Sequence, residues 1–564
     1  MPYYCNPLNV NYRYQIPKKM GDAEPGSAWR EAADPSMIFF QGKYYIFASM
    51  SLDVLVSEDM ANWQNHRLPE DLPLYDYAPD VRVHGEYVYF CASRILSNCD
   101  RYRTKDILNG PYERIEGNFP YWDPNLFFDD DGRVYFYWGC SDKEPIYGIE
   151  LDLVSMLPIG EKVAVIGGRP EELGFERIGE DHCVEPTPTQ GRPFIEGAWM
   201  TKYQGKYYLQ YAFAGTEYNI YGDGVYVGDS PLGPFHLQEN NPYSYHPGGF
   251  FPGAGHGSTM EDASGNLWHT STMRISLNHI FERRVGQWPA GFDQDGELFC
   301  NQRYGDWPKK VTGLAHDPWE EPEWMLLSGG KQAWASSEAV GHPAANATQE
   351  NVQSWWKSAS NSREEWLQVD LGERYCVHAV QINFADDGMY LPCRDESKGI
   401  TRFIEDITYP TQWKLLGSGD GETWVVLEDK SNAQTNLSHD LVVMEEGLQL
   451  RYLKLTDICV PYEQAPCISG LRVFGTGDGP KPATADFTAV RRGDLDMDIT
   501  IDRTGDGAMG YEILWGHRPN KLYHSRTLFG STVSIGALVK GQEYYVRVDS
   551  FNENGITRGK LKKL

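Results

Sequence analysis

Three carboxyl groups and one imidazole occur in similar sequence contexts at widely spaced points of the chain. They are Asp34 in "EAADPSMI", Asp123 in "YWDPNLFF", Glu196 in "PFIEGAWM" and His256 in "GAGHGSTM". Carboxyl groups donate or accept protons and hydrogen-bond to hydroxyl groups, and imidazole does the same near neutral pH. If the fold brings the four together, they could perform general acid–base chemistry on a polar substrate.

The segments that carry these residues follow one repeated plan. Each reads as a strand, a turn that contains glycine, and a second strand rich in Tyr, Phe or Val. Five segments fit, at residues 33–49, 77–93, 121–139, 195–212 and 255–272, and the second of them has Ala78 at the front position. Each unit is long enough for a small four-stranded sheet, so the repeat predicts an all-β, five-bladed propeller.

A propeller would explain why the front positions matter. The innermost strand of every blade lines the central axis, so residues at equivalent places converge although they are far apart in sequence. Asp-Pro and Glu-Gly are also ordinary turn sequences, and any one of them taken alone is better read as structure. Three acids and a histidine at equivalent places indicate a site.

With Arg274 in "TMRIS", these motifs resemble glycoside hydrolase family 43 over residues 1–325. The segment "FERRVGQWPAGFDQDGELFCNQ" (281–302) is similar to the closing segment of such propellers. The resemblance implies a five-bladed catalytic propeller with one acid at the head of each of blades one, three and four. It also implies an enzyme that hydrolyses O-glycosyl bonds and inverts the anomeric configuration.

On this resemblance, three residues are expected to be catalytic. Asp34 is the general base that activates water, and Glu196 is the general acid that protonates the leaving oxygen. The acid must hold its proton near neutral pH, which a nearby like charge on Asp123 favours. Asp123 is also expected to accept a hydrogen bond from a sugar hydroxyl and so to orient the ring.

His256 and Arg274 are expected to bind substrate. In related propellers the equivalent histidine forms the floor beneath the sugar and interacts with a buried calcium ion, largely through water. His256 is therefore also the expected metal-site residue; no cofactor is required for the reaction, and any calcium on the axis would be structural. Arg274 would donate hydrogen bonds to the sugar or to a catalytic carboxylate. The alternatives are a structural histidine and a surface arginine.

Two further β-sandwich domains are expected after the propeller. Residues 326–476, with "WLQVDLG" and "ISGLRVFG", resemble discoidin-like, family 32 carbohydrate-binding modules. Sugar binding and bracing of the propeller are both open roles for this domain. After a Gly/Pro-rich linker at 477–487, residues 484–564 resemble a fibronectin type III domain, with Trp515 in the core and Tyr544 as the corner tyrosine.

Composition excludes several classes of partner. The chain has 564 residues, a formal net charge of −28 and a sequence pI near 4.9. Nucleic acid and anionic membrane surfaces carry charge of the same sign, so neither is expected as a partner. A neutral oligosaccharide fits better, since the aromatic content of 13% offers flat faces that suit sugar rings. The sequence shows no self-association face.

The start of the chain, "MPYYCNPLNVNYRYQ", lacks the basic and apolar regions of a secretory signal. No apolar span of about 18 residues follows, so no membrane-spanning helix is expected. The expected location is cytoplasmic, or secreted if a leader was removed. The ten cysteines lack metal-binding spacing and are expected to be mostly reduced thiols.

The leading functional hypothesis is an exo-acting glycosidase that releases a pentose, α-L-arabinofuranose or β-D-xylose, from oligosaccharides derived from plant polysaccharides. An exo-β-galactosidase or an arabinan hydrolase of the same family is the enzymatic alternative. A non-catalytic, sugar-binding propeller is the alternative from another class, and the presence of all three carboxyl groups counts against it.

Overall fold

The computed structural model describes residues 2–18, 26–73, 75–95, 100–116, 119–182, 194–395, 401–503 and 506–564. In this part of the chain the regular structure is strand, apart from four single-turn 3₁₀ helices. No helix in it combines the length and the apolar character needed to cross a bilayer. The predicted all-β fold is confirmed.

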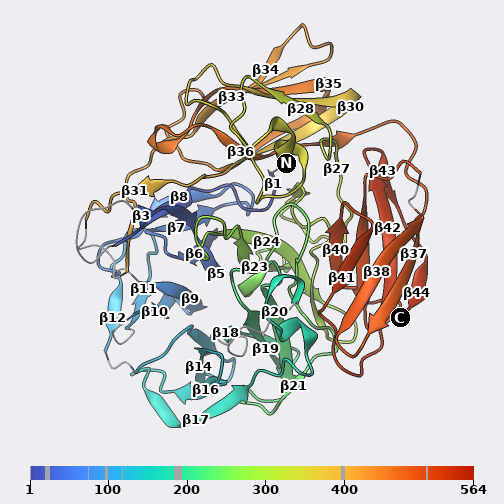
Figure 1. The fold of residues 1–564 in the computed structure, drawn as a ribbon. Coiled ribbons are helices and arrows are strands. Elements are labelled where there is room, and N and C mark those ends of the chain that lie inside the picture. Colours follow the sequence, from blue (N-terminus) through green and yellow to red (C-terminus); the bar gives the residue numbers. More distant parts are fainter. Residues whose placement is uncertain are drawn as a thin grey trace.

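Five antiparallel sheets stand around a common axis (Figure 1). The first two blades consist of β5 (Ala33–Phe40), β6 (Lys43–Ser49), β7 (Asp53–Ser57) and β8 (Gln64–Arg67), then β9 (Tyr77–His84), β10 (Tyr87–Ser93), β11 (Arg101–Thr104) and β12 (Glu113–Ile115). The third consists of β13 (Asn125–Phe128), β14 (Val134–Trp138), β16 (Ile146–Leu151) and β17 (Pro158–Ile166).

The last two blades complete the propeller. Blade four consists of β18 (Phe194–Tyr203), β19 (Lys206–Ala214), β20 (Gly222–Gly228) and β21 (Phe235–Leu237), with the short β15 (Cys140–Ser141) added beside β18. Blade five consists of β22 (Gly255–Glu261), β23 (Leu267–Arg274), β24 (Arg283–Phe292) and β25 (Leu298–Cys300). The five predicted units are therefore the five blades.

Hydrogen bonds between neighbouring innermost strands hold the blades in a ring. In four of the five junctions, a polar side chain two residues after the front position of one blade accepts a backbone N–H of the next. The pairs are Met37 N to Ser258 Oγ at 2.9 Å, Val81 N to Ser36 Oγ at 3.0 Å, Leu126 N to Asp80 Oδ2 at 2.7 Å and Met200 N to Asn125 Oδ1 at 2.9 Å. At the junction of blades four and five, Trp199 Nε1 donates to Thr259 O at 3.0 Å. The contact of Met37 with Ser258 joins the first blade to the last and closes the ring.

The front positions share an unusual backbone conformation. Asp34, Ala78, Asp123 and His256 have φ of 48°, 50°, 49° and 50°, in the left-handed region that residues other than glycine rarely adopt. In blade four this place belongs to Gly197, with φ of 59°, and not to Glu196, which was predicted to occupy it. Pairing of β18 with β19 is irregular here, between Glu196 and Trp199, so Glu196 enters the site one residue early.

The first sandwich lies beside the propeller and is built on two long strands. Its eight-stranded sheet consists of β27 (Met325–Leu326), β28 (Gln332–Ala335), β29 (Trp356–Lys357), β30 (Leu367–Phe384), β33 (Gln412–Ser418), β34 (Val425–Asp429), β35 (His439–Cys459) and β36 (Cys467–Thr476). Trp356 and Trp413 are fully buried in its core. This β-sandwich fits the predicted discoidin-like domain.

The C-terminal region forms two smaller sheets. One consists of β37 (Asp486–Arg492), β38 (Asp496–Arg503) and β41 (Thr532–Ile535), the other of β39 (Gly510–Gly516), β40 (His524–Leu528), β42 (Tyr545–Asn552), β43 (Gly555–Thr557) and β44 (Leu561–Lys563). Trp515 is buried as predicted, and the Tyr544 hydroxyl accepts the Val539 N–H at 2.9 Å, so both packing predictions are confirmed. The fibronectin type III assignment and the three domain boundaries stay predictions.

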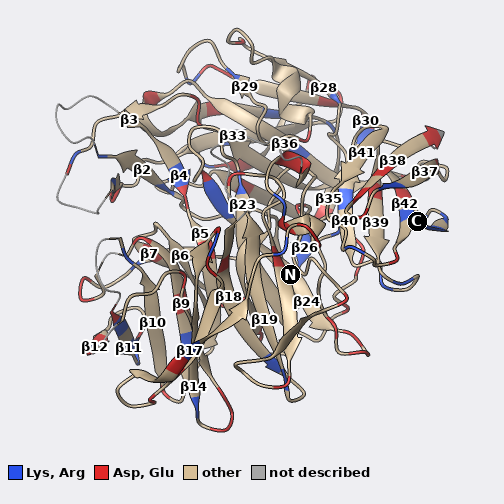
Figure 2. Ribbon diagram, turned by 60° about the horizontal axis from the view of Figure 1, so that its bottom comes forward, with Lys and Arg blue, Asp and Glu red and all other residues tan. Residues whose placement is uncertain are grey.

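The first sandwich also reaches into the propeller. Its segment β32 (Arg402–Ile404) pairs with β2 (Arg13–Pro17), which pairs in turn with β4 (Trp29–Glu31) directly before blade one. Two smaller pairs also tie the start of the chain down: β3 (Gly26–Ser27) with β31 (Tyr390–Leu391), and β1 (Tyr3–Tyr4) with β26 (Lys309–Lys310). β4 also lies against β24 of blade five, and Figure 2 shows charged residues on the segments around β4.

Candidate active site

Asp34 heads the innermost strand of blade one and is 4% exposed. The Ser49 hydroxyl donates to its Oδ2 at 2.6 Å, the Thr272 hydroxyl to its Oδ1 at 3.3 Å, and Arg283 Nη1 to the same Oδ1 at 3.2 Å. Burial alone would raise the pKa of Asp34, but the positive charges of Arg283 and His256, with these hydrogen bonds, hold it below its usual value. Asp34 is therefore ionised, as a general base must be.

Asp123 occupies the equivalent place in blade three and is also 4% exposed. Its backbone N–H donates to Ser93 Oγ at 2.8 Å, and the Ser93 hydroxyl donates back to Oδ1 at 3.2 Å. Burial raises the pKa of Asp123 to about 7; His256 opposes this rise, whereas the charges of Glu196 and Asp34 add to it. Near neutral pH this carboxyl is therefore much easier to protonate than an ordinary aspartate.

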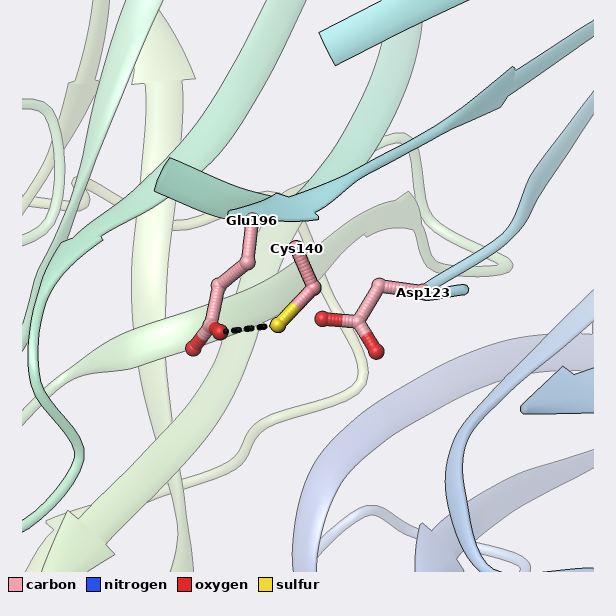
Figure 3. Close-up of side chains that lie close together, drawn as sticks. All are labelled: Asp123, Cys140 and Glu196. Carbon is pink, nitrogen blue, oxygen red and sulfur yellow. Dashed lines mark hydrogen bonds between the residues drawn. The ribbon is translucent and has the colours of Figure 1, made fainter. Parts of the chain in front are cut away.

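Glu196 is half-buried and held at both carboxyl oxygens. The Tyr221 hydroxyl donates to Oε1 at 2.5 Å, and the Cys140 thiol donates to Oε2 at 3.1 Å. Figure 3 shows the Cys140 sulfur between the carboxyl groups of Glu196 and Asp123, and one ligand atom of each residue lies within 4.8 Å of the others. These contacts fix the direction in which the Glu196 carboxyl points.

Strand pairing explains how Cys140 reaches the site. The two residues of β15 leave blade three and pair with β18, which places Cys140 opposite Glu196. Burial and the neighbouring carboxylates of Glu196 and Asp123 raise the pKa of the Cys140 thiol far above its usual value. The sulfur therefore keeps its proton and acts as a weak hydrogen-bond donor.

His256 lies between the two aspartates. Its Nδ1 is 3.6 Å from Asp34 Oδ1 and 3.9 Å from Asp123 Oδ2. Burial works against its positive charge, but Asp34, Asp123 and Glu196 together raise the pKa of His256 above its usual value. A Cβ atom at Gly197 would lie 2.7 Å from the His256 ring, so only glycine leaves room for the imidazole there.

Arg283, which was not singled out from the sequence, contacts a carboxyl of the cluster, whereas substrate binding by Arg274 stays a prediction. Arg274 Nη2 lies 2.8 Å from Glu180 Oε1 and donates to Glu180 Oε2 at 2.9 Å, so its guanidinium pairs with Glu180 and not with a carboxyl of the cluster. Arg283, on β24, is the arginine that contacts Asp34. Consecutive strand residues point to opposite faces, and Arg284 on the other face donates to Arg30 O at 2.7 Å. The sequence "ERRV" contains both arginines but does not say which one faces the axis.

Three contributors to the site were missed or left undecided from sequence: Arg283, Tyr221 and Cys140. Tyr221 lies in "GTEYNIYGDG", which predicts outer strands of blade four with either Tyr218 or Tyr221 at the rim. No sequence signal marks Cys140, because its position depends on a two-residue strand that leaves its own blade.

Half-buried aromatic rings border the cluster. Tyr77 precedes the front residue of blade two and Trp122 precedes that of blade three, and their ring centres are 6.2 Å apart. The ring centre of Phe281 is 5.7 Å from that of Tyr77. These rings offer the flat apolar surfaces on which a sugar ring can pack.

The residues present do not fit a calcium ion ligated directly by His256. Among the described residues, groups of three close metal-ligating side chains occur at Asp123, Cys140 and Glu196, and at Glu239, Glu297 and His517. Calcium prefers oxygen ligands, whereas each group contains a thiol or an imidazole, and neither includes His256. Calcium held near His256 through water stays a prediction.

The arrangement can carry acid–base chemistry on a bond held between two carboxyl groups. Asp34 is ionised, Glu196 is oriented by two donors, and His256 and Asp123 stand between them. Hydrolysis of a glycosidic bond needs this combination, a carboxylate that activates water and a carboxyl that protonates the leaving oxygen.

Comparison with known proteins agrees with this chemistry. Residues 30–297 match the model of glycosyl hydrolases family 43, and residues 346–455 match that of the NedA-like, galactose-binding domain. Xylosidase/arabinosidase 43A of Humicola insolens is 30% identical over 259 residues, which are 36% of this chain and 77% of the relative.

Two further relatives extend the range of named activities. A xylosidase/arabinosidase of Bacteroides ovatus is 26% identical over 36% of this chain and 76% of its own length. A β-D-galactofuranosidase of Aspergillus niger is 25% identical over 36% of this chain and 62% of its own length.

Fold, site and relatives define a glycosidase that hydrolyses O-glycosyl bonds. The chain belongs to glycosyl hydrolase family 43 and carries a galactose-binding, discoidin-like domain after its propeller. The resemblance inferred from the sequence motifs is confirmed for these two regions.

Proposed function

We propose that this glycosidase releases a terminal pentose, α-L-arabinofuranose or β-D-xylose, from short oligosaccharides, with inversion of the anomeric configuration. The observation that carries the proposal is the pairing of an ionised Asp34 with an oriented Glu196 across His256 and Asp123. The relatives named xylosidase/arabinosidase support the choice of sugar.

In the proposed reaction, Asp34 is the general base. A water molecule gives a proton to the Asp34 carboxylate while its oxygen forms a bond to the anomeric carbon. Arg283 and the Ser49 hydroxyl hold the carboxylate in place and keep it ionised before the reaction.

Glu196 is the proposed general acid. Its proton passes to the glycosidic oxygen as the bond from that oxygen to the anomeric carbon breaks, so the leaving group departs as a neutral alcohol. Tyr221 and Cys140 orient the carboxyl and stabilise the carboxylate that remains. The two carboxyl groups return to their starting states when Asp34 loses its proton and Glu196 regains one from solvent.

Asp123, His256 and the aromatic rings are proposed to bind the sugar. Asp123 accepts a hydrogen bond from a sugar hydroxyl, and His256 donates one or stabilises the negative charge around it. Because Asp34 and Asp123 are each only 4% exposed, the site suits a terminal ring better than the middle of a long chain.

A panel of nitrophenyl glycosides tests the choice of sugar. We expect turnover of the α-L-arabinofuranoside or the β-D-xyloside, and kcat/KM at least tenfold lower for the β-D-galactopyranoside. A preference for the galactopyranoside would contradict the proposal. Proton NMR of the first-formed sugar tests inversion, and a product with the anomeric configuration of the substrate would rule out Asp34 as a base acting through water.

A β-D-galactofuranosidase or arabinanase activity is the second candidate. Relatives so named, from Aspergillus niger and Thermotoga petrophila, are each 25% identical to this chain over the matched regions. Adding the galactofuranoside and a linear arabinan to the panel separates these activities. Rapid cleavage of arabinan into internal fragments would favour the second candidate.

A further inference from the structure

The discoidin-like sandwich contributes one strand to the propeller side of the molecule. In the three-stranded sheet of β32, β2 and β4, Ile404 and Trp29 both pair with Gln15, and Arg402 pairs with Pro17. Arg402, on the sandwich's strand, and Glu31, on β4, thus belong to one sheet next to the head of blade one. Residues about 370 positions apart in the chain come together there.

Arg402 is buried at this junction, with 4% of its surface exposed. Its Nη1 lies 3.0 Å from Glu31 Oε2, and its Nη2 donates to the Tyr77 hydroxyl. Its guanidinium also lies over aromatic rings, 5.2 Å from the ring centres of Trp29 and Tyr77 and 5.7 Å from that of Phe281. A buried guanidinium with this many partners is fixed in position.

Glu31 transmits this contact to the cluster. It is fully buried, and its other oxygen, Oε1, accepts from Arg283 Nη2 at 2.6 Å and from Arg283 Nε at 3.1 Å. Arg283 Nη1 in turn contacts Asp34 Oδ1 at 3.2 Å. Four buried groups of alternating charge, Arg402, Glu31, Arg283 and Asp34, therefore form one chain of contacts. Loss of an outer member leaves a buried charge uncompensated, which is costly in a poorly solvated interior.

Arg402 also holds the aromatic rings that border the site. The guanidinium lies close to the rings of both Tyr77 and Phe281, and Arg283 lies over Phe281 at 4.9 Å from its ring centre. The same side chain is thus tied to the proposed base through charge and to the proposed sugar-binding wall through packing.

We propose that Arg402, supplied by the discoidin-like sandwich, is a positioning residue of the active site: through Glu31 it holds Arg283 against Asp34, and through Tyr77 and Phe281 it fixes the aromatic wall. This inference rests on the proposed role of Asp34 as the base. The sandwich is then part of the catalytic unit, and its position beside the propeller serves catalysis.

The full-length chain tests this with Arg402→Gln and Arg402→Lys, and with Arg394→Ala as the matched control. Arg394 is an arginine of the same region of the sandwich, but its ion pairs are with Glu405 and Asp406 and not with Glu31. The readouts are kcat/KM as a function of pH on the best nitrophenyl glycoside, and the melting temperature of each variant.

We expect Arg402→Gln to lower kcat/KM by about 10- to 100-fold, the size of effect that misplacement of a catalytic group produces. The charged or titratable groups that face Asp34 are Arg283, His256, Asp123, Tyr221 and Cys140, with Glu31 and Arg402 behind Arg283. Loss of one positive charge makes Asp34 easier to protonate, so the acidic limb of the pH profile moves to higher pH. Arg402→Lys keeps the charge and should keep the wild-type acidic limb, and Arg394→Ala should stay within about twofold of wild type.

An Arg402→Gln variant with the activity and acidic limb of the Arg394→Ala control would overturn the inference. If the Gln variant does not fold, Arg402→Met, which retains contact with the rings, takes its place. Its acidic limb must then lie at higher pH than that of the Arg394→Ala control. A wild-type chain that cleaves no pentoside contradicts the proposed sugar instead, and the same pH profiles are then recorded on the glycoside that it does cleave.

Discussion

Blades one and three present the same residue type in the same backbone conformation, yet the two carboxyl groups behave in opposite ways. Asp34 and Asp123 have φ of 48° and 49°, and each is 4% exposed and hydrogen-bonded to a serine hydroxyl. The pKa of Asp34 is lowered, whereas that of Asp123 is raised to about 7. Burial is the same, so the partners must differ.

Arg283 is the difference. It comes from β24 of blade five and contacts Asp34. Asp123 lies close to Glu196 and the Cys140 thiol instead, and His256 lies near both aspartates. The propeller repeat thus sets where each carboxyl stands, and unrepeated residues set its charge. One repeated position can therefore supply both an ionised and a protonatable carboxyl within a single site.

The largest expected effect comes from removing the ionised carboxyl. Asp34→Asn should lower kcat/KM by about 10⁴-fold, because an amide cannot take the proton from water. Asp123→Asn should cost less, about 10²-fold, because it removes binding and charge but not the base. Steady-state kinetics on one chromogenic substrate checks both, and equal losses would contradict the assigned difference between the blades.

Removing the general acid should depend on the leaving group. Glu196→Gln should lower kcat/KM by about 10³-fold on an unactivated disaccharide and by less than about tenfold on a substrate with a dinitrophenolate leaving group, which departs without protonation. Comparison of the two substrates separates this role from general damage to the site. Equal losses on both substrates would remove Glu196 as the acid.

Exchange of Arg283 for lysine should make Asp34 resemble Asp123 more closely. A lysine ammonium cannot contact Glu31 and Asp34 together as the arginine fork does, so its contact with Asp34 is weaker. The pKa of Asp34 then rises, and the acidic limb of the kcat/KM profile moves to higher pH. The pH profile of Arg283→Lys measures the shift. A profile that coincides with wild type would show that Arg283 does not set the charge of Asp34.

Asp123 should also make stability depend on pH. Its folded pKa is raised to about 7, from an unfolded value of about 3.9, so its favourable contribution is present at low pH and is lost as pH rises through 7. The melting temperature of Asp123→Asn minus that of wild type should therefore increase between pH 5 and pH 8. A constant difference across this range would contradict the raised pKa.

The smallest effect is expected at Cys140. Cys140→Ser keeps a donor beside Glu196 and should change kcat/KM by less than about threefold, whereas Cys140→Ala should cost about three- to tenfold, since a single neutral hydrogen bond contributes about 1 kcal/mol. Kinetics of the two variants on the same substrate decide this. A Ser variant as impaired as the Ala variant would show that the hydrogen bond to Glu196 is not the reason for the loss.

The parts of the fold that repeat could be predicted from sequence. Asp34, Asp123 and His256 lie where the hairpin pattern places them, because each blade needs the same left-handed turn before its innermost strand. The sequence pattern placed Glu196 at the front position of blade four. In the structure the next residue, Gly197, has the left-handed conformation of that position, and Glu196 directly precedes it.

The parts that depend on a single long-range contact could not be predicted. Alternation along β24 does not say which of the consecutive residues Arg283 and Arg284 faces the axis, so no role in the site could be assigned to Arg283 from sequence. Cys140 reaches Glu196 through a two-residue strand, and Arg402 reaches Glu31 from another domain. Neither contact leaves a periodic signal in the sequence.

Infrared difference spectroscopy of the protonated carboxyl band, recorded against pH, tests the contrast between the two aspartates most directly. The account predicts that wild type has a protonated carboxyl signal, lost near pH 7, that is absent from Asp123→Asn. Asp34→Asn should retain this signal at a lower pH, because the charge of Asp34 helps to raise the pKa of Asp123, and should lack instead a signal that titrates below the usual range for aspartate. Loss of the signal near pH 7 in Asp34→Asn, with its retention in Asp123→Asn, would contradict it.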